Sequence, residues 1–397
     1  MSELSYLEKL LDGVEVEWRN LGDTSLFEIA NNGRKPVKAS LRIAGETPYY
    51  GANNIQDYVD GYTHDGEYVL IAEDGSASLE NYSIQYATGK FWANNHVHVV
   101  RGKERVHSRF LYHYLCIVNF LPFLTGGGRA KLTKGQLIEI PVPIPCPDNP
   151  EKSLAIQSEI VRILDKFTAL TAELTAELNM RKKQYNHYRD QLLSFEDGEV
   201  EWKALEEVSD IYDSLHQTPQ YSKNGLSMIR VTDIKNGYID LKNTLKVNDG
   251  IFSIFTKKYL PQKNDLVMSR VGSYGNVGII PTDNSACMGQ NTVVIHPHIN
   301  NRYLFYILTS SIGQDFIEKN VGGGSQKTLS LKSIKSIPIP LTGESEQSKI
   351  VSILDKFDTL TTSISEGLPR EIELRQKQYE YYRDLLFSFP RPETASN

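Results

Sequence analysis

The stretch RKKQYNHYRDQLLSF occupies residues 181–195, and RQKQYEYYRDLLFSF occupies residues 375–389, with ten of the fifteen letters identical. The phrase QSEIVRILDKF at 157–167 also recurs, as QSKIVSILDKF at 347–357. Repeats of this length, separated by nearly half the chain, indicate a duplicated architecture. The sequence therefore predicts two copies of one structural unit.

Shorter echoes appear in both halves of the chain: VEW (16–18) and VEW (200–202), GGGRAKL (126–132) and GGGSQKTL (322–329), and IPVP (140–143) and IPIP (337–340). The chain thus reads as a variable block, a repeated helix, a second variable block and a second repeated helix. The opening YLEKLLDG resembles the end of a repeated helix. We therefore expect the two ends of the chain to lie near each other.

The repeated phrases carry apolar and aromatic side chains at alternating steps of four and three residues, which is the pattern of a coiled-coil seam. These side chains are Ile160, Leu164, Phe167, Leu174, Leu178, Tyr185, Tyr188 and Leu192 in the first copy, and Ile350, Leu354, Phe357, Tyr379, Tyr382 and Leu386 in the second. We expect each seam to pack against the other copy in the same chain, as an antiparallel pair. Pairing between two chains is the alternative.

Two local features modify these helices. The second copy contains the extra residues EGLP (366–369), so a break or kink is expected at Pro369. The first copy contains the tandem repeat TAELTAEL (171–178). It consists of good helix formers, and it is either a chance repetition or a module that sets the helix length, at about 6 Å per TAEL unit.

The variable blocks alternate short apolar runs with turn-forming residues, which is typical of strands. The expected strands are 68–72, 96–100, 265–269, 276–280 and 291–295, and the expected helices are 109–121 and 302–317. The predicted fold class is α+β, with two globular domains separated by a long antiparallel two-helix coiled coil in a pseudo-two-fold repeat. The predicted divisions are residues 1–150 with a short helix over 3–12, 151–197 (first helix), 198–342, 343–390 (second helix) and the tail 391–397.

Composition is typical of a globular protein, with 40% hydrophobic and 23% charged residues in 397. The sequence offers no transmembrane stretch and no secretory signal, so no membrane partner is expected. Cys116, Cys146 and Cys287 are widely spaced, which favours reduced thiols in a cytoplasmic protein. The net charge of −6 disfavours nucleic acid at first sight, but nine Lys/Arg face four Asp between Lys223 and Arg270. Ordinary charge scatter is the alternative explanation.

Motifs for catalysis are missing from the sequence. It has no phosphate-binding loop of the GxxxxGK[S/T] type, no methyltransferase motif and no nucleophile elbow. VGSYGNVG (271–278) is rich in glycine but lacks the lysine; a tight hairpin is the preferred explanation, and a phosphate contact is the alternative. The pairs His96/His98 and His296/His298 do not correspond in the repeat, so strand-end polar residues are expected there and no metal.

DNA readout remains as a possible function. It needs Arg, Lys, Asn, Gln and His side chains at base edges and phosphates, and the loops of this sequence supply them. The candidate DNA contacts are Tyr50, Gly51, Asn53, Asn54, Asn95, His96, Arg129 and Lys131 in the first block, and Arg230, Arg270, Ser273, Tyr274, Asn276, Asn291, Gln326 and Lys327 in the second.

These residues carry a resemblance. The region IVRILDKF…LTAELTAELNMRKKQYNHYRDQLLSF and its second copy resemble the specificity subunits (HsdS) of type I restriction–modification enzymes, in particular the type IC group. PYYGANN…EDG…NNHVHVV and LVMSRVGSYGNVG resemble strings of target recognition domains in the same family. The similarity covers the whole chain and is most specific over residues 132–203 and 337–389.

The resemblance implies a DNA-binding, non-catalytic subunit of a restriction and methylation complex. The two variable blocks would be target recognition domains, each reading one half of a split, asymmetric site in double-stranded DNA. The helices would set the gap and dock two methyltransferase subunits, which carry S-adenosylmethionine. Restriction subunits would add translocation and cleavage with ATP and Mg²⁺, and this chain would hold no cofactor itself. The alternatives are a coiled-coil adaptor with two protein-binding heads, and a restriction enzyme with a catalytic site of its own.

Overall fold

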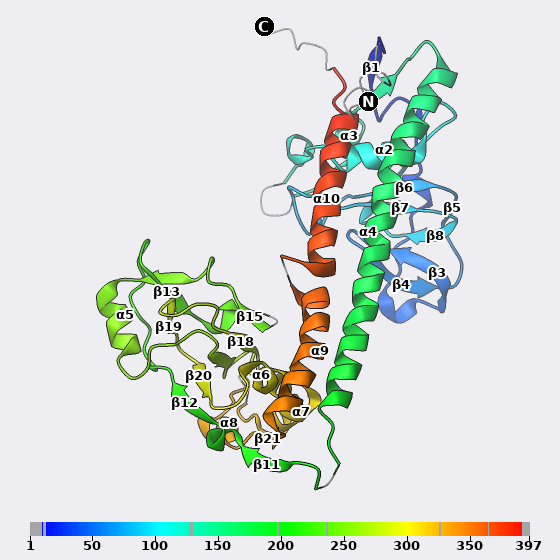
Figure 1. Ribbon diagram of the computed structural model, residues 1–397. Helices are drawn as coiled ribbons and strands as arrows, with labels where there is room; N and C mark the ends of the chain where they lie inside the picture. Colours follow the sequence, from blue (N-terminus) through cyan, green and yellow to red (C-terminus); the bar gives the residue numbers. More distant parts are fainter. Residues whose placement is uncertain are drawn as a thin grey trace. The chain divides into compact units, whose positions relative to one another are not determined.

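The computed structural model of the chain describes residue 10 and residues 13–126, 130–196, 198–235, 237–324, 327–363 and 365–390 (Figure 1). The contacts divide it into unit 1, Met1–Ala172 with Leu374–Asn397, and unit 2, Glu173–Glu373. Each unit therefore combines one variable block with parts of both repeated helices. The predicted helix 3–12, apart from Leu10, and the predicted tail 391–397 lie outside the described residues. The domain boundaries drawn from the sequence stay a prediction.

Unit 1 is a mixed α and β structure with two four-stranded sheets, in the orders β2-β9-β6-β7 and β4-β3-β8-β5, and the small ribbon β1-β10. Helix α2 packs against β6, β7 and β9. The elements are β1 (Val16–Asn20), β2 (Phe27–Ile29), η1 (Asn31–Gly33), η2 (Ala39–Leu41), β3 (Ala44–Tyr50), β4 (Ile55–Val59), β5 (His64–Asp65), β6 (Tyr68–Ala72), β7 (Ile84–Ala87), β8 (Lys90–Ala93), β9 (Val97–Gly102), α2 (Ser108–Leu115), η3 (Leu121–Phe123), α3 (Lys134–Leu137) and β10 (Pro141–Pro145).

Unit 2 has a six-stranded sheet in the order β12-β20-β17-β18-β15-β14, a three-stranded sheet β16-β13-β19 and the ribbon β11-β21. Its elements are β11 (Glu201–Ala204), η4 (Leu205–Glu207), β12 (Ser209–Asp213), β13 (Leu226–Ile229), η5 (Val231–Asp233), β14 (Ile234–Lys235), β15 (Gly237–Ile239), β16 (Leu245–Val247), α5 (Asp249–Thr256), β17 (Leu266–Ser269), β18 (Val277–Ile279), β19 (Ala286–Met288), β20 (Thr292–Pro297), α6 (Asn301–Thr309), α7 (Ser311–Asn320), α8 (Leu331–Lys335), β21 (Pro338–Leu341) and α9 (Glu344–Thr362).

The two units share a scaffold. The strand order β2-β9-β6 in unit 1 matches β12-β20-β17 in unit 2, and all of these neighbours are antiparallel. The ribbon β1-β10 likewise matches β11-β21, which explains the repeated VEW and IPVP/IPIP strings. The fourth strands also correspond, because β7 pairs with β6 and β18 pairs with β17, both antiparallel. Beyond them the sheets differ, since only the sheet of unit 2 continues, with β15 and β14. The α+β class and the internal repeat predicted from the sequence are therefore confirmed.

The first repeated helix is α4, which runs unbroken over Pro150–Leu192. Asn149 begins it, because its Oδ1 accepts from the Lys152 N–H (3.0 Å), and proline is favoured at the first helical position. In unit 1, the early part of α4 packs against the end of α10 (Gly367–Leu386), as Figure 1 shows. In unit 2, the late part of α4 packs against the beginning of α9. Both pairings are therefore antiparallel, as the sequence predicted.

The second repeated helix is broken as predicted. It consists of α9, ending at Thr362, and α10, beginning at Gly367. Gly367 has φ +74°, and a Cβ there would lie 2.5 Å from the Thr359 carbonyl oxygen. A glycine is thus needed where the chain turns into α10, and Pro369 falls in the first turn, where its missing N–H costs little.

Two helix predictions need correction. The helix expected over 109–121 ends at Leu115, and the helix expected over 302–317 is two helices, α6 and α7. Ser310 separates them with an extended backbone (φ −79°, ψ 176°), and its hydroxyl donates to the Ile307 carbonyl (2.7 Å). A side chain that satisfies the helix end locally is a feature that apolar periodicity does not reveal.

Described residues near the two ends of the chain meet within unit 1, in agreement with the expectation. The indole N–H of Trp18 donates to the carbonyl of Pro390 (2.9 Å). Among the described residues, the structure contains no helix that is both long and apolar enough to cross a membrane.

Candidate nucleic-acid interface

Four loops of unit 1 meet where strands β3, β6 and β8 end. Asn53 links two of them, because its amide donates to the Gly75 carbonyl (2.9 Å) and its Oδ1 accepts from the Ala77 N–H (2.8 Å). His96 Nδ1 lies 2.5 Å from a carboxylate oxygen of Asp74. Loops that the sequence singled out separately therefore form one surface.

Glu73 is the electrostatic centre of this surface. Lys131 Nζ lies 3.0 Å from one of its carboxylate oxygens, and Arg34 Nη1 lies 2.6 Å from the other. Burial raises the pKa of the Glu73 carboxyl, but the hydrogen bonds from both cations outweigh it, so the pKa lies below its ordinary value. Lys131 also forms backbone bridges with Asp74 and Thr125, which attach the glycine-rich loop to the cluster.

Tyr50 and Gly51 support the surface rather than extend from it. The Tyr50 ring packs edge-on against Phe91, with 5.9 Å between centroids, and burial raises the pKa of its hydroxyl. A Cβ at Gly51 would lie 2.0 Å from the Gln56 side-chain amide. A side chain at this position would therefore require the exposed Gln56 side chain to move.

Asn53, Asn54, Asn95, His96 and Lys131 are the exposed members of the predicted set in unit 1. Within the part of the chain that the structure describes, the side chains of Asn54 and Asn95 have no hydrogen-bond partner. Amide groups of this kind can pair with base edges, and an exposed ammonium group can pair with a phosphate. The predicted contact Arg129 lies outside the described residues.

In unit 2, Arg270 is committed to internal contacts. Its Nη1 lies 2.6 Å from Asp213 Oδ1, and its Nε donates to the Leu329 carbonyl (3.1 Å). Its side chain is only 12% exposed. Its backbone N–H donates to the Asn291 carbonyl (2.8 Å), and Asn291 adopts a left-handed φ of +64°. In the structure Arg270 therefore holds loops together, and its contact with DNA stays a prediction.

Tyr274 and Lys327 meet on the surface of unit 2. The Tyr274 hydroxyl donates to Glu318 (2.7 Å), and Lys327 Nζ lies 3.4 Å from the same carboxylate and 6.0 Å from the centroid of the Tyr274 ring. The bond to Glu318 raises the pKa of Tyr274. Ser273 and Asn276 are exposed in the adjoining loop. This group offers both an aromatic face and an exposed cation.

Arg230 is held by its neighbour Asp233, through Nε (3.0 Å) and Nη2 (2.8 Å). Its side chain is about one-third exposed, so an outside contact competes with this pair. The predicted contact Gln326 lies outside the described residues.

Within each unit, isolated backbone bridges connect the loops, and these bridges lie at corresponding positions in the two units. In unit 1, Lys131 bridges Asp74 and Thr125; in unit 2, Thr328 bridges Val271 and Gly322. The bridging positions correspond in the repeat, but their side chains differ. One scaffold therefore presents two unlike sets of polar groups.

The predicted seam residues come together within each unit. Phe167 stacks on Tyr382 in unit 1 (5.3 Å between centroids), and Tyr188 stacks on Phe357 in unit 2 (5.7 Å). The remaining seam residues of the two cores are Ile160, Leu164, Tyr379 and Leu386 in unit 1, and Tyr185, Leu192, Ile350 and Leu354 in unit 2. Leu174 and Leu178 are half-buried and belong to neither core.

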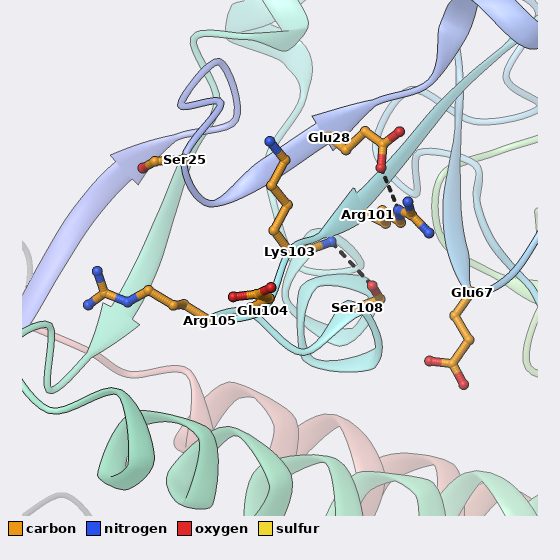
Figure 2. A pocket seen from close by; sticks show the side chains of 9 residues that line it. Ser25, Glu28, Glu67, Arg101, Lys103, Glu104, Arg105 and Ser108 are labelled. Carbon is orange, nitrogen blue, oxygen red and sulfur yellow. Dashed lines mark hydrogen bonds and ion pairs between the residues drawn. The ribbon is translucent and has the colours of Figure 1, made fainter.

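A pocket of about 530 Å³ beside the N-terminus of α2 contains none of the predicted DNA contacts (Figure 2). Two of its cations have internal partners: Arg101 pairs with Glu28 (2.6 Å), and Lys103 donates to the Thr24 carbonyl. The Ser108 hydroxyl accepts from the backbone N–H of Gly102 (3.2 Å), as Figure 2 also shows. We assign no ligand to this pocket.

Sequence reasoning did not find the acidic partners of the interface. Asp213 lies 57 residues from Arg270, and Glu318 lies 44 residues from Tyr274, so no local pattern marks these pairs. Arg34 is equally remote from Glu73. The string EDG (73–75) was a weak sequence signal for these acidic partners, because two acids and a glycine follow an apolar strand there.

Comparisons with known proteins agree with this geometry. Residues 14–181 and 198–374 each match the family described as "Type I restriction modification DNA specificity domain". The chain is 48% identical over 398 residues to a protein of Haemophilus influenzae assigned as a type I restriction enzyme specificity subunit, covering 97% of this chain and 98% of the relative. It is 40% identical over 418 residues to the specificity subunit of an Escherichia coli type I restriction enzyme, covering 100% of both chains.

The fold has a counterpart among solved structures. The crystal structure of a type I restriction–modification S subunit from M. genitalium matches with a TM-score of 0.57, over 96% of this chain and 98% of that one. The sequence identity is 14%, so this likeness concerns the fold alone.

Proposed function

This chain belongs to the family of type I restriction–modification DNA specificity subunits, and from that premise we propose that each of its two recognition modules reads one half of a bipartite, asymmetric DNA sequence. Members of this family are non-catalytic, recognise DNA and assemble with other subunits. The modules are the variable blocks of units 1 and 2, which stand in tandem.

The observation that carries the proposal is the shared bridge between reading loops. Asp74 with Lys131 and Val271 with Thr328 occupy corresponding positions in the two units. Equivalent scaffolds with unlike side chains suit the reading of two different half-sites by one chain. A symmetric pair of modules would instead favour a palindrome.

We assign different roles to the exposed groups. Lys131 and Lys327 would contact phosphates, because their side chains are 47% and 54% exposed. Asn54, Asn95 and His96 would face base edges in unit 1, since amide and imidazole groups suit direct readout. Both lysines already neighbour a carboxylate, so phosphate binding would exchange one anion for another.

The proposed partners are two methyltransferase subunits and, in the complete complex, restriction and translocation subunits. The repeated helices would dock the methyltransferase subunits and set the gap between the half-sites. S-adenosylmethionine, ATP and Mg²⁺ would be bound by those partners and not by this chain. The complex would act in the cytoplasm, where its DNA substrate is accessible.

The test is to co-express the chain with its matching methyltransferase subunits and to map methylated adenines across the genome. We expect a two-part motif with a fixed run of unread bases. A continuous palindrome, or methylation that does not depend on this chain, contradicts the proposal. No observation favours the adaptor with two protein-binding heads.

A further inference from the structure

An aspartate at the same place in each repeated helix holds the first long helix of the adjoining module. In unit 1, Asp165 of α4 accepts from Arg109 Nε of α2 (2.8 Å). In unit 2, Asp355 of α9 accepts from Arg302 Nε of α6 (2.8 Å). Both aspartates belong to the repeated phrase ILDKF, and both arginines stand at the beginning of their helices.

A second side chain, one turn further along each module helix, binds the same carboxylate oxygen. It is His113 in unit 1, at 2.8 Å from Asp165, and Tyr306 in unit 2, at 2.5 Å from Asp355. The two units therefore build the same three-membered group, with one position chemically different. We call these groups the aspartate clasps: Asp165, Arg109 and His113 in unit 1, and Asp355, Arg302 and Tyr306 in unit 2.

The clasp of unit 1 reaches both helices of its pair. Burial is the main reason that the pKa of His113 is lowered to about 4, so the ring is neutral at pH 7. Its single N–H must be on Nε2, because the Asp165 carboxylate can only accept. Nδ1 is then free to accept from the Tyr379 hydroxyl of α10, at 3.4 Å.

The clasp of unit 2 is reinforced differently. Arg302 Nη2 also lies 3.0 Å from Asp358, one turn beyond Asp355 on α9. Its guanidinium packs over the Tyr306 ring, 5.0 Å from the centroid. Because the guanidinium group of Arg302 is planar and makes several directed contacts, it fixes the geometry of the clasp more strictly than a single point charge would.

A buried glutamine acts with each clasp. Gln157 Oε1 accepts from the His107 N–H (2.8 Å), and Gln347 Oε1 faces the Asn300 N–H at 3.4 Å. Both glutamines are almost fully buried, and both stand eight residues before the clasp aspartate. The glutamine and the aspartate, which are identical in QSEIVRILDKF and QSKIVSILDKF, thus both contact the module.

The module helix in turn supports the strands that end at the reading loops. Helix α2 packs against β6, which leads directly into Glu73, and α6 packs against β18, which follows the loop of Tyr274. A change in the angle between α2 and α4 would therefore move the reading loops without altering their shape.

We infer that the aspartate clasps are positioning devices, which fix the orientation of each recognition module on its own helix pair and thereby limit the tolerated gap between half-sites. The inference rests on the proposed function, because a gap exists only if two half-sites are read. Asp165 and Asp355 are positioning residues, since each acts through its module helix and touches no base.

The experiment uses the full chain, co-expressed with its methyltransferase subunits, in wild-type form and as Asp165→Ala and Asp355→Ala. Methylated adenines are mapped on a library in which the gap is the wild-type length or differs by one base pair. The measured quantity is the ratio of methylation at altered gaps to methylation at the wild-type gap. A variant that merely folds less well lowers both values and leaves this ratio unchanged.

The expected result is a ratio that rises several-fold in each variant, with unchanged half-site letters. The matched control is Asp384→Ala, because that carboxylate is exposed on α10 and pairs only with the adjacent Arg383 among the described residues. Asp165→Asn and Asp355→Asn keep the side-chain volume, so they replace the alanine variants in the same measurement if the alanine variants fold poorly.

The outcomes separate the two ideas. A wild-type chain that yields no two-part motif refutes the proposed function, and the clasp inference falls with it. A wild-type motif with an unchanged gap ratio in both the alanine and the asparagine variants overturns the clasp inference alone. Altered half-site letters, or loss of all methylation in folded variants, also overturn it, because the clasps should leave the reading loops intact.

Discussion

Replacing Arg270 with alanine separates a structural role from a DNA-binding one. The sequence suggested that Arg270→Ala weakens DNA binding without unfolding the chain. In the structure, its guanidinium binds Asp213 (2.6 Å) and the Leu329 carbonyl (3.1 Å). We therefore expect the substitution to lower stability first.

The magnitude follows from burial. The side chains of Arg270 and Asp213 are 12% and 18% exposed, so removal of one leaves a largely buried carboxylate without its main cation. Breaking a fully buried pair costs about 3–5 kcal/mol, and an unsatisfied buried polar group about 1–3 kcal/mol. Because some solvent reaches Asp213, we expect the free energy of unfolding to fall by about 2–3 kcal/mol.

Urea unfolding of the full chain at pH 7 measures this loss. The midpoint of the transition should fall, and the dependence of the free energy of unfolding on urea concentration should stay unchanged. Lys327→Ala is the control: its pair with Glu318 is more than half exposed, so solvent screening leaves little stability to lose. Unchanged stability of Arg270→Ala, together with weaker DNA binding across a salt series, would refute this reasoning and restore the prediction made from sequence.

Three further predictions concern the core, pH and DNA affinity. Leu164→Ala and Leu354→Ala should each lower the free energy of unfolding by about 2–5 kcal/mol, because both side chains are fully buried. Leu170→Ala, at an exposed position, should have little effect. Equal losses in urea unfolding for all three variants would contradict the packing. Because the pKa of His113 is lowered from 6.5 to about 4, the folded chain binds fewer protons than the unfolded chain between these values. Its contribution to stability is therefore complete above pH 6.5 and is lost as the pH falls towards 4, by up to about 3 kcal/mol, and a pH series of His113→Gln should be flatter than that of the wild type. Lys131→Ala should reduce the slope of log affinity against log salt by about one and leave the half-site letters unchanged, and an unchanged slope would remove Lys131 from the phosphate contacts.

The repeated helices could be predicted from sequence in some detail. Heptad spacing placed Leu164 and Leu354 in the seams, and Gly367 and Pro369 lie where the predicted break occurs. Strands such as β6 were equally visible, because five consecutive apolar residues, Tyr68–Ala72, are all buried. These features depend on local periodicity, which a single sequence displays directly.

The interface could be predicted only in part. The sequence identified the polar loops, but it could not show that Arg270 binds Asp213 or that Lys327 shares Glu318 with Tyr274. Such pairs join residues that are far apart in the chain, so their identity depends on how the strands are ordered. The same limit hid the aspartate clasps, whose aspartates lie 49 to 56 residues from the side chains that they bind.

The central claim is that two recognition modules are held at a distance set by helix length, and deletion of residues 175–178 tests it most directly. This TAEL unit lies inside α4, which is unbroken from Pro150 to Leu192. Removing four residues shortens a helix by about 6 Å, on the order of two base-pair steps. Methylation mapping of the deletion variant should show both half-site sequences unchanged and a shorter gap between them. Altered half-site letters, or an unaltered gap in an active complex, would contradict the account.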